Sequence, residues 1–436
     1  MEIESLYNIF LESKGVTTDS RKCADGLMFF ALKGERFNGN SFAAQALSQG
    51  CICSVVDDAR FFDANDKRMV LVDNVLKTLQ QLALYHRRAL GLPVIGITGT
   101  NGKTTTKELV TSVMRRRFKL NATVGNLNNS IGVPLTVLAT TPADEYAIVE
   151  MGASHPGDIR ELVDIAEPDY GLITNVGKAH LLGFGSFEGV MATKGELYDF
   201  LRAHGGKAFV NRSNPYLMQM AQGLDRMEYA SGVDGNVQGA LVSGKVLECN
   251  PYLKFQWQSQ NGPVHEVQTR LIGSYNIDNA LAAASVGVFF GVPESDICQA
   301  LEEYTPSNNR SQLTVTASNR LVVDAYNANP TSMAAALENF SLMQSASKML
   351  ILGDMRELGD ASDAEHQKVV EALKQYGFEN VWLVGAEFQK ASAGAFRCFD
   401  SVDQVIEELS ANPVKDRTVL LKGSNGIGLF KLVEKL

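Results

Sequence analysis

Val94-Ile95-Gly96-Ile97-Thr98-Gly99-Thr100-Asn101-Gly102-Lys103-Thr104 is the stretch from which the architecture of this 436-residue chain can be predicted. Its first five residues form a short apolar strand, and a helical pattern follows from 104 to 118. The glycines let backbone N–H groups approach an anion, Lys103 adds a positive charge, and the start of a helix favours phosphate. The hydroxyl of Thr104 can bind Mg²⁺. A strict phosphate-loop motif would have glycine where Ile97 stands, but Gly-Lys-Thr between a strand and a helix still predicts a nucleotide site.

Strands and helices alternate on both sides of this loop, which predicts an α/β fold with mostly parallel sheets. The chain is too long for a single compact domain. Residues up to Arg88 have the pattern of a small α/β domain, and Thr305-Pro306-Ser307-Asn308-Asn309 is a polar linker. Beyond the linker, four apolar strands separated by helical patterns predict a second doubly wound module; they are expected at 321–326, 349–353, 381–385 and 418–422. The predicted domains are 1–88, 89–307 and 308–436.

Composition excludes several classes of protein. The formal net charge of −9 argues against nucleic-acid binding, which needs a basic surface. The six cysteines contain no Cys-x-x-Cys pair, so no zinc or redox motif is indicated. The first residues lack a basic region followed by an apolar stretch, and no apolar run is long enough to cross a bilayer. We expect a cytoplasmic protein without a membrane span.

Three further side chains are candidates for metal chemistry. Glu150 ends an apolar strand at 146–150, and His180 follows another at 170–175. A carboxylate at a strand end is often only a cap, and a single histidine is often only a satisfied polar residue. Downstream of a phosphate loop, the two together become candidate Mg²⁺ ligands, although imidazole is unusual for this cation. Lys194 fits a solvated helix residue, but a lysine with a lowered pKa can also react with CO₂ to form a carbamate, an anion able to bind a second Mg²⁺.

Several motifs resemble those of the Mur ligases of peptidoglycan synthesis. They are Gly99 to Thr104, Val124-Gly125-Asn126-Leu127-Asn128-Asn129, Glu150-Met151-Gly152-Ala153, Ala179-His180 and Lys194-Gly195-Glu196. Two longer motifs, Asp324 to Met333 and Leu352 to Gly359, resemble the branch that adds D-alanyl-D-alanine to UDP-N-acetylmuramoyl-tripeptide. The resemblance extends over essentially the whole chain.

The resemblance implies a small N-terminal α/β domain for the UDP-sugar, a central ATPase domain of the phosphate-loop type and a C-terminal Rossmann-like domain. It also implies a reaction: ATP phosphorylates the terminal carboxylate of the tripeptide, and the amine of the dipeptide attacks the acyl phosphate. ATP, two Mg²⁺ ions and a carbamylated Lys194 are the implied cofactors. UDP-N-acetylmuramoyl-tripeptide and D-alanyl-D-alanine are the implied partners, and a monomer is expected.

The resemblance also assigns roles to individual residues. The implied catalytic residues are Lys103, Glu150, His180 and Lys194. The implied metal ligands are Thr104, Glu150, His180 and Lys194. The implied nucleotide contacts are Gly99, Thr100, Asn101, Gly102, Lys103, Thr104, Thr105, Asn276, Asn279, Arg310, Asp324, Asn327 and Asn329. The implied substrate contacts are Ser20, Arg21, Lys33, Gly34, Asn126, Asn129 and Lys422.

The chain departs from the family pattern at two positions. Tyr275-Asn276 replaces His-Asn beside the expected adenine site, and tyrosine can stack on a base but lacks imidazole chemistry. Lys422-Gly423-Ser424-Asn425 replaces Lys-Gly-Ser-Arg, which removes a rigid group suited to carboxylates and phosphates.

Three other interpretations stay open at this point. One is another amide ligase of the superfamily, such as a folylpolyglutamate synthase, although Asp19-Ser20-Arg21 in a complete first domain disfavours it. The second is a kinase or nucleotide switch, which would need neither the second Rossmann-like module nor the Lys194 motif. The third is a non-catalytic paralogue that binds the precursor, which the change at Asn425 keeps open.

Overall fold

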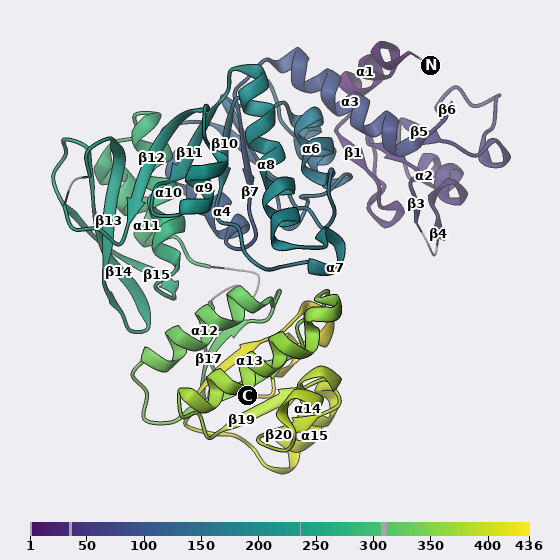
Figure 1. The fold of residues 1–436 in the computed structure, drawn as a ribbon. Helices are drawn as coiled ribbons and strands as arrows, with labels where there is room; N and C mark the ends of the chain where they lie inside the picture. The colour runs from purple at the N-terminus through teal and green to yellow at the C-terminus, as the bar shows by residue number, and fades with distance from the viewer. Residues whose placement is uncertain (1, 35–36, 236, 307–311) are drawn as a thin grey trace.

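The computed structural model describes residues 2–34, 37–235, 237–306 and 312–436. Figure 1 shows three bodies that follow one another along the chain, each built from helices and a β-sheet. The expected α/β fold class is confirmed, since nearly all strand pairs in the three main sheets are parallel.

The N-terminal body has a four-stranded sheet of order β1-β2-β5-β6, with a small β3-β4 hairpin beside it, in the residues that the structure describes. Its elements are α1 (Ile3–Glu12), β1 (Val16–Thr17), η1 (Ser20–Lys22), β2 (Met28–Phe30), β3 (Lys33–Gly34), β4 (Phe37–Asn38), η2 (Gly39–Phe42), α2 (Ala43–Ser48), β5 (Cys53–Val56), η3 (Ala59–Phe61), β6 (Met69–Leu71) and α3 (Val75–Leu90). The two faces of the sheet bury separate apolar clusters.

The central body has a sheet of order β15-β14-β13-β12-β11-β10-β7-β9-β8. Its elements are β7 (Val94–Thr98), α4 (Lys103–Met114), β8 (Leu120–Ala122), α5 (Gly132–Leu138), β9 (Tyr146–Glu150), α6 (Asp158–Ala166), β10 (Tyr170–Ile173), α7 (Leu181–Phe184), α8 (Phe187–His204), β11 (Lys207–Asn211), α9 (Pro215–Met220), β12 (Asp225–Ser231), β13 (Ala240–Cys249), β14 (Tyr252–Ser259), β15 (His265–Ile272), α10 (Asn276–Phe289) and α11 (Glu294–Glu303). Helices α3, α5, α6 and α8 bury one face of this sheet, and α4, α10 and α11 bury the other.

The C-terminal body has a sheet of order β16-β17-β21-β18-β19-β20, in which only β16 runs antiparallel to its neighbour. Its elements are β16 (Gln312–Val315), β17 (Arg320–Asp324), α12 (Pro330–Leu342), β18 (Lys348–Gly353), η4 (Gly359–Ala361), α13 (Ser362–Gln375), β19 (Val381–Val384), α14 (Ala386–Ser392), β20 (Arg397–Phe399), α15 (Val402–Ala411), β21 (Thr418–Lys422), η5 (Asn425–Ile427) and η6 (Leu429–Leu432). The four expected strands are present as β17, β18, β19 and β21, and β16 and β20 were not predicted.

The expected domain boundaries lie at 88/89 and 307/308. The limit between 307 and 308 lies outside the described residues, and so does Arg310. Near the limit between 88 and 89, α3 continues to Leu90 and packs on α5 and α6 of the central body. The helix expected from 104 to 118 ends at Met114, because Arg115, Arg116 and Arg117 form a turn.

Candidate active site

The phosphate loop lies between the carboxyl end of β7 and the first turn of α4. Gly99 and Gly102 have φ of +144° and +77°, the region that favours glycine. Asn175, which follows β10, fixes the loop: its backbone carbonyl accepts a hydrogen bond from Thr100 N at 2.9 Å, and its side-chain oxygen accepts one from Asn101 N at 3.0 Å. No side chain caps the first turn of α4. The N–H groups of that turn therefore form an anion-binding site.

Substituting Gly99 with alanine is expected to weaken nucleotide binding and slow turnover. A Cβ atom on this residue would lie 2.0 Å from Thr174 Oγ1, so the loop or β10 would have to move. We expect the KM for ATP to rise at least tenfold, as measured by phosphate release. Gly91→Ala is the matched control, because Gly91 also has positive φ, +63°, but has open space around its Cα. Equal activity of the two variants would contradict this account of the loop.

Lys103, Thr104 and Glu150 meet beside the loop. Lys103 Nζ donates hydrogen bonds to the carbonyl oxygens of Gly99 at 2.9 Å and Thr100 at 3.1 Å, so the charge lies over the loop. Glu150 is fully buried at the end of β9 and accepts hydrogen bonds from Thr104 Oγ1, at 2.9 Å, and Asn128 Nδ2, at 2.8 Å. The hydroxyl and carboxylate oxygens are the type of donor that Mg²⁺ prefers. These residues therefore fit a magnesium ion.

His180 lies at the contact between the central and C-terminal bodies. Its φ is +50°, and its Nδ1 lies against the carboxylate of Glu357, which follows β18. Burial lowers the pKa of His180, which favours the neutral imidazole. The described residues contain no cluster of three or more His, Cys, Asp or Glu side chains arranged to bind a metal. The role of His180 as a ligand stays a prediction.

Lys194 lies in α8, and its buried amine faces the segment that follows β9. The side chain is buried, Nζ is 3.5 Å from the carbonyl oxygen of Ala153, and it lies 5.3 Å from the centre of the Phe184 ring. Burial, with a smaller effect from the charge of Lys103, lowers the pKa of Lys194 to about 7. Near neutral pH a large fraction of this amine is therefore unprotonated, the form that reacts with CO₂.

Lys194→Met is expected to stabilise the protein most at low pH. The pKa of Lys194 is about 7 in the folded chain and 10.5 for an unperturbed lysine, as in the unfolded chain, so the unfolded chain binds more protons between these values. Burial of the charged amine therefore lowers the free energy of unfolding by its full amount below pH 7. This destabilisation disappears as the pH rises towards 10.5. In CO₂-free buffer, the excess Tm of the variant over the wild type should shrink between pH 6.5 and 9.5. A pH-independent difference would refute this pKa, and Lys207→Met serves as the control.

Asn276 and Asn279 lie in the first turn of α10, directly behind the phosphate loop. Asn279 Nδ2 donates to Asn276 Oδ1 at 2.8 Å, and Asn279 Oδ1 accepts from Thr106 Oγ1 at 3.0 Å. Tyr275 is partly exposed and lines a small cavity between the central and C-terminal bodies, together with Asp324. The structure thus brings the expected adenine and ribose contacts to one side of the loop.

Asp324 and Lys422 form an ion pair at the carboxyl ends of the adjacent strands β17 and β21. Lys422 Nζ is 2.5 Å from Asp324 Oδ2 and donates to the carbonyl oxygen of Asn327 at 3.3 Å. Only 1% of the Lys422 side chain is exposed. Its charge is therefore used within the C-terminal body, where it orders the 324–329 loop.

Asn329 connects that loop to the phosphate loop. Its side chain caps α12 by accepting from Ser332 N at 2.9 Å, and its Nδ2 donates to Asn101 Oδ1 at 2.7 Å. Thr105 lies half-buried in the first turn of α4. The two bodies thus meet directly at the candidate nucleotide site.

The expected contacts for the UDP-sugar lie in the N-terminal body. Ser20 and Arg21 belong to η1, where Arg21 pairs with Asp19 at 2.8 Å and is largely exposed. Lys33 and Gly34 form β3, and Lys33 Nζ pairs with Asp57 at 2.8 Å.

Asn126 and Asn129 lie in the loop between β8 and α5. Asn126 is exposed. Asn129 Oδ1 accepts hydrogen bonds from Gly132 N at 2.9 Å and Ile131 N at 3.2 Å, so this side chain orders the start of α5. Asn126 is therefore the freer of the two to contact a substrate.

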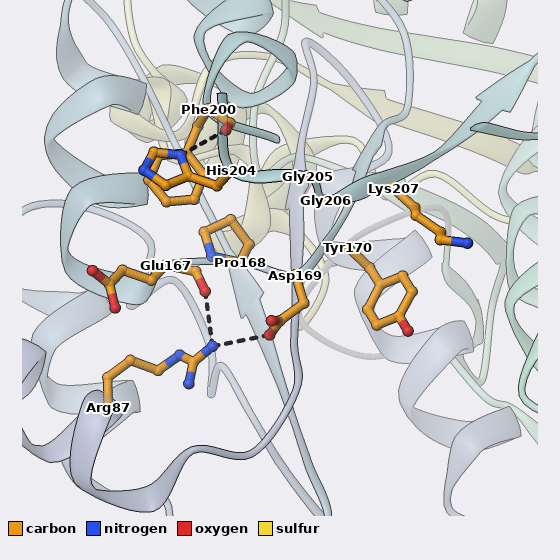
Figure 2. Close-up of a pocket in the computed structure, with 10 residues that line it drawn as sticks. All are labelled: Arg87, Glu167, Pro168, Asp169, Tyr170, Phe200, His204, Gly205, Gly206 and Lys207. Atoms are coloured by element: carbon orange, nitrogen blue, oxygen red, sulfur yellow. Dashed lines mark hydrogen bonds and ion pairs between the residues drawn. The ribbon is translucent and has the colours of Figure 1, made fainter. Parts of the chain in front are cut away.

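A cavity of about 430 Å³ lies at the opposite, amino ends of β10 and β11 (Figure 2). Arg87 of α3 donates to the carbonyl oxygen of Glu167 at 2.9 Å and to the carboxylate of Asp169 at 2.9 Å. The imidazole of His204 stacks on Phe200 nearby. The two hydrogen bonds of Arg87 attach α3, and with it the N-terminal body, to the central sheet. The cavity is separate from the phosphate loop.

Two residues of the site were not predicted from the sequence. Asn175 fixes the phosphate loop, and Asn128 donates to Glu150. Both are uncharged. The signal for Asn175 is a polar amide just after an apolar strand, and Asn128 lies inside the 124–129 motif without a role assigned to it.

Comparison with known families identifies the class of protein. The chain matches the Mur ligase family, catalytic domain, over residues 12–87, the Mur ligase middle domain over 97–287, and the Mur ligase, glutamate ligase domain, over 309–425. The chain belongs to the Mur ligase family. Among curated relatives, the UDP-N-acetylmuramoyl-tripeptide--D-alanyl-D-alanine ligase of Bacillus subtilis (strain 168) is 34% identical, over 97% of this chain and 93% of that protein. The ligase of the same name from Escherichia coli (strain K12) is 33% identical, with the same coverage.

Solved structures agree with this assignment. MurF from Acinetobacter baumannii has a TM-score of 0.87 at 29% identity, with 100% of this chain and 98% of that chain covered. MurF ligase from Thermotoga maritima in complex with ADP has a TM-score of 0.84 at 25% identity, with 98% and 97% covered. The family predicted from the motifs is thereby confirmed, and so is the three-domain α/β architecture.

Proposed function

We propose that the chain is an ATP-dependent ligase that joins D-alanyl-D-alanine to UDP-N-acetylmuramoyl-tripeptide in peptidoglycan precursor synthesis. The observation that carries this proposal is the meeting of the phosphate loop, buried Glu150 and buried Lys194 at the contact with the C-terminal body. The substrates follow from the nearly full-length similarity to ligases of that name. ATP as the nucleotide is supported by the related ligase that binds ADP.

The residues of the phosphate loop would hold the triphosphate. The uncapped N–H groups of α4 bind phosphate oxygens, and Lys103 turns from its loop carbonyls towards the same charge. Asn276, Asn279 and Asp324 would border the nucleoside, beside Tyr275; the Asn276–Asn279 hydrogen bond and the small cavity shared by Tyr275 and Asp324 support this role. Catalysis by this arrangement depends on positioning and electrostatic stabilisation.

Thr104, Glu150 and His180 would hold magnesium, with Lys194 as a carbamate for a second ion. When bound, magnesium neutralises charge on the transferring phosphoryl group. Glu150 is pre-oriented by Asn128, and the lowered pKa of Lys194 favours carbamate formation. Binding of both substrates between the bodies keeps water from the acyl phosphate until the amine of the dipeptide attacks.

The precursor would extend from the N-terminal body towards this crevice. Ser20, Arg21, Lys33 and Gly34 would bind its uridine diphosphate, and Asn126 and Asn129 would contact the part of the precursor that extends towards the phosphate loop. The domain limits 1–88, 89–307 and 308–436, a monomeric state and a cytoplasmic location belong to the same proposal. None of the helices in the described residues is long and apolar enough to span a membrane.

Phosphate release from ATP tests the proposal. It should require UDP-N-acetylmuramoyl-tripeptide and D-alanyl-D-alanine together and be absent with either alone. Release independent of the dipeptide would indicate a different ATPase or ligase, such as one acting on folylpolyglutamate. Precursor binding without any release would indicate a non-catalytic paralogue. Mass spectrometry of the product should show the dipeptide joined to the precursor.

A further inference from the structure

Arg356 lies between two loops of the C-terminal body. It follows β18 and contacts the loop after β21, the next strand of the sheet. Its backbone N–H donates to Ser424 Oγ at 2.9 Å, and its Nη2 donates to the carbonyl oxygen of Gly426 at 3.2 Å. A Cβ atom on Gly426 would lie 2.4 Å from Arg356 Nη1, so the guanidinium lies directly against the backbone of Gly426. The guanidinium is thus held at a defined position.

The charge of Arg356 is not neutralised within the described part of the chain. No Asp or Glu carboxylate there lies within 4.0 Å of its guanidinium, and the side chain is exposed. The neighbouring cation at this edge of the sheet, Lys422, is buried against Asp324. Across the contact, Lys178 pairs with Glu365. Arg356 is therefore the cation at this edge that is free to bind an anionic ligand.

The position of Arg356 is also at the junction of the two bodies. The carboxylate of the next residue, Glu357, lies against His180, and its backbone carbonyl accepts from Leu182 N at 3.2 Å. Arg356 and Asn425 are thus neighbours on the C-terminal side of this junction. Asn425 occupies the place where the family motif has arginine, so Arg356 brings a guanidinium to the same loop from another strand.

We propose that Arg356 binds the terminal carboxylate of the incoming dipeptide. This inference rests on the proposed function and assigns the site of its amine substrate. A dipeptide must present its amine to the acyl phosphate, so its carboxylate has to be held at the opposite end. A guanidinium has five N–H donors in a planar fork that matches a carboxylate, and Arg356 uses one of them on Gly426. Arg356 thereby selects peptides with a free carboxyl terminus and sets their direction.

Steady-state kinetics of the full-length enzyme test this assignment, with D-alanyl-D-alanine and its C-terminal amide as the two amine substrates. Loss of a charge-assisted hydrogen bond should raise the KM for D-alanyl-D-alanine in Arg356→Ala about 10- to 100-fold. The KM values for ATP and for the UDP-linked tripeptide should stay within about twofold. Arg356→Lys should restore part of the affinity. Lys374→Ala, which removes an exposed cation of α13, is the control and should behave as the wild type.

The amide substrate separates binding from a purely structural role. The wild type should strongly prefer the acid over the amide, and Arg356→Ala should use both about equally. An equal rise in KM for acid and amide would mean that Arg356 only holds the 424–426 loop, and would overturn the proposal. An unchanged KM for the acid would overturn it as well. If the wild type releases no phosphate with either dipeptide, the proposed function itself fails, which is a distinct outcome.

Discussion

Lys194→Ala is expected to lower the rate of ligation by about 10²- to 10³-fold, the loss typical when one preorganised electrostatic group is removed from an active site. The amine of Lys194 is buried beside Ala153 and Phe184, and its pKa of about 7 allows it to capture CO₂ as a carbamate. Without that anion, a bound magnesium ion would lose a ligand. Phosphate release with saturating substrates measures the effect.

Rescue by small carboxylates distinguishes a carbamate from a simple lysine. Truncation at residue 194 leaves a buried space next to the site, and formate or acetate can fill it with an equivalent charge. We expect added acetate to raise the ligation rate of Lys194→Ala at least tenfold and to leave the rate of Lys207→Ala unchanged. Full activity of Lys194→Ala without additives would show that no carbamate is needed. Loss of activity without rescue by any small carboxylate would favour a role for the amine itself.

Lys103→Met is expected to reduce ATP turnover by about 10³-fold, since it removes the positive charge over the phosphate loop. Methionine keeps much of the length and apolar character of the lysine stem, so the start of α4 should remain folded. The charge acts on the transferring phosphoryl group, and kcat should therefore fall more than the affinity for nucleotide.

The control for this substitution is Lys119→Met, which changes an exposed lysine near the end of the same helix–strand unit. Equilibrium binding of ATP, measured separately by calorimetry, distinguishes weak binding from slow chemistry. A normal kcat in Lys103→Met would show that the charge of Lys103 is not needed for phosphoryl transfer.

The sequence predicted the parts of the fold that bury continuous apolar runs. Strands β17, β18, β19 and β21 lie where expected because each has a run of branched apolar residues buried in the sheet. Strands β16 and β20 form the two edges of the sheet. They are short and only partly buried, so their pattern was too weak to detect.

Local sequence also predicted the phosphate loop and the side chains that its chemistry requires. It could not predict contacts between residues far apart in the chain. Asn101 and Asn329 are 228 positions apart, and their pairing depends on how two folded bodies meet. The pairing of His180 with Glu357 and the approach of Arg356 to Gly426 depend on the same tertiary arrangement.

The hydrogen bond between Asn101 and Asn329 has a thermodynamic consequence. Asn101 belongs to the loop that would surround the triphosphate, and Asn329 starts the first helix of the C-terminal body after β17. Any nucleotide that changes the position of Asn101 therefore changes how firmly that body is docked. Linkage is reciprocal: the factor by which ATP changes the affinity for the dipeptide equals the factor by which the dipeptide changes the affinity for ATP. The Asn101–Asn329 pair is thus a direct physical link through which the nucleotide site and the docked C-terminal body can influence each other.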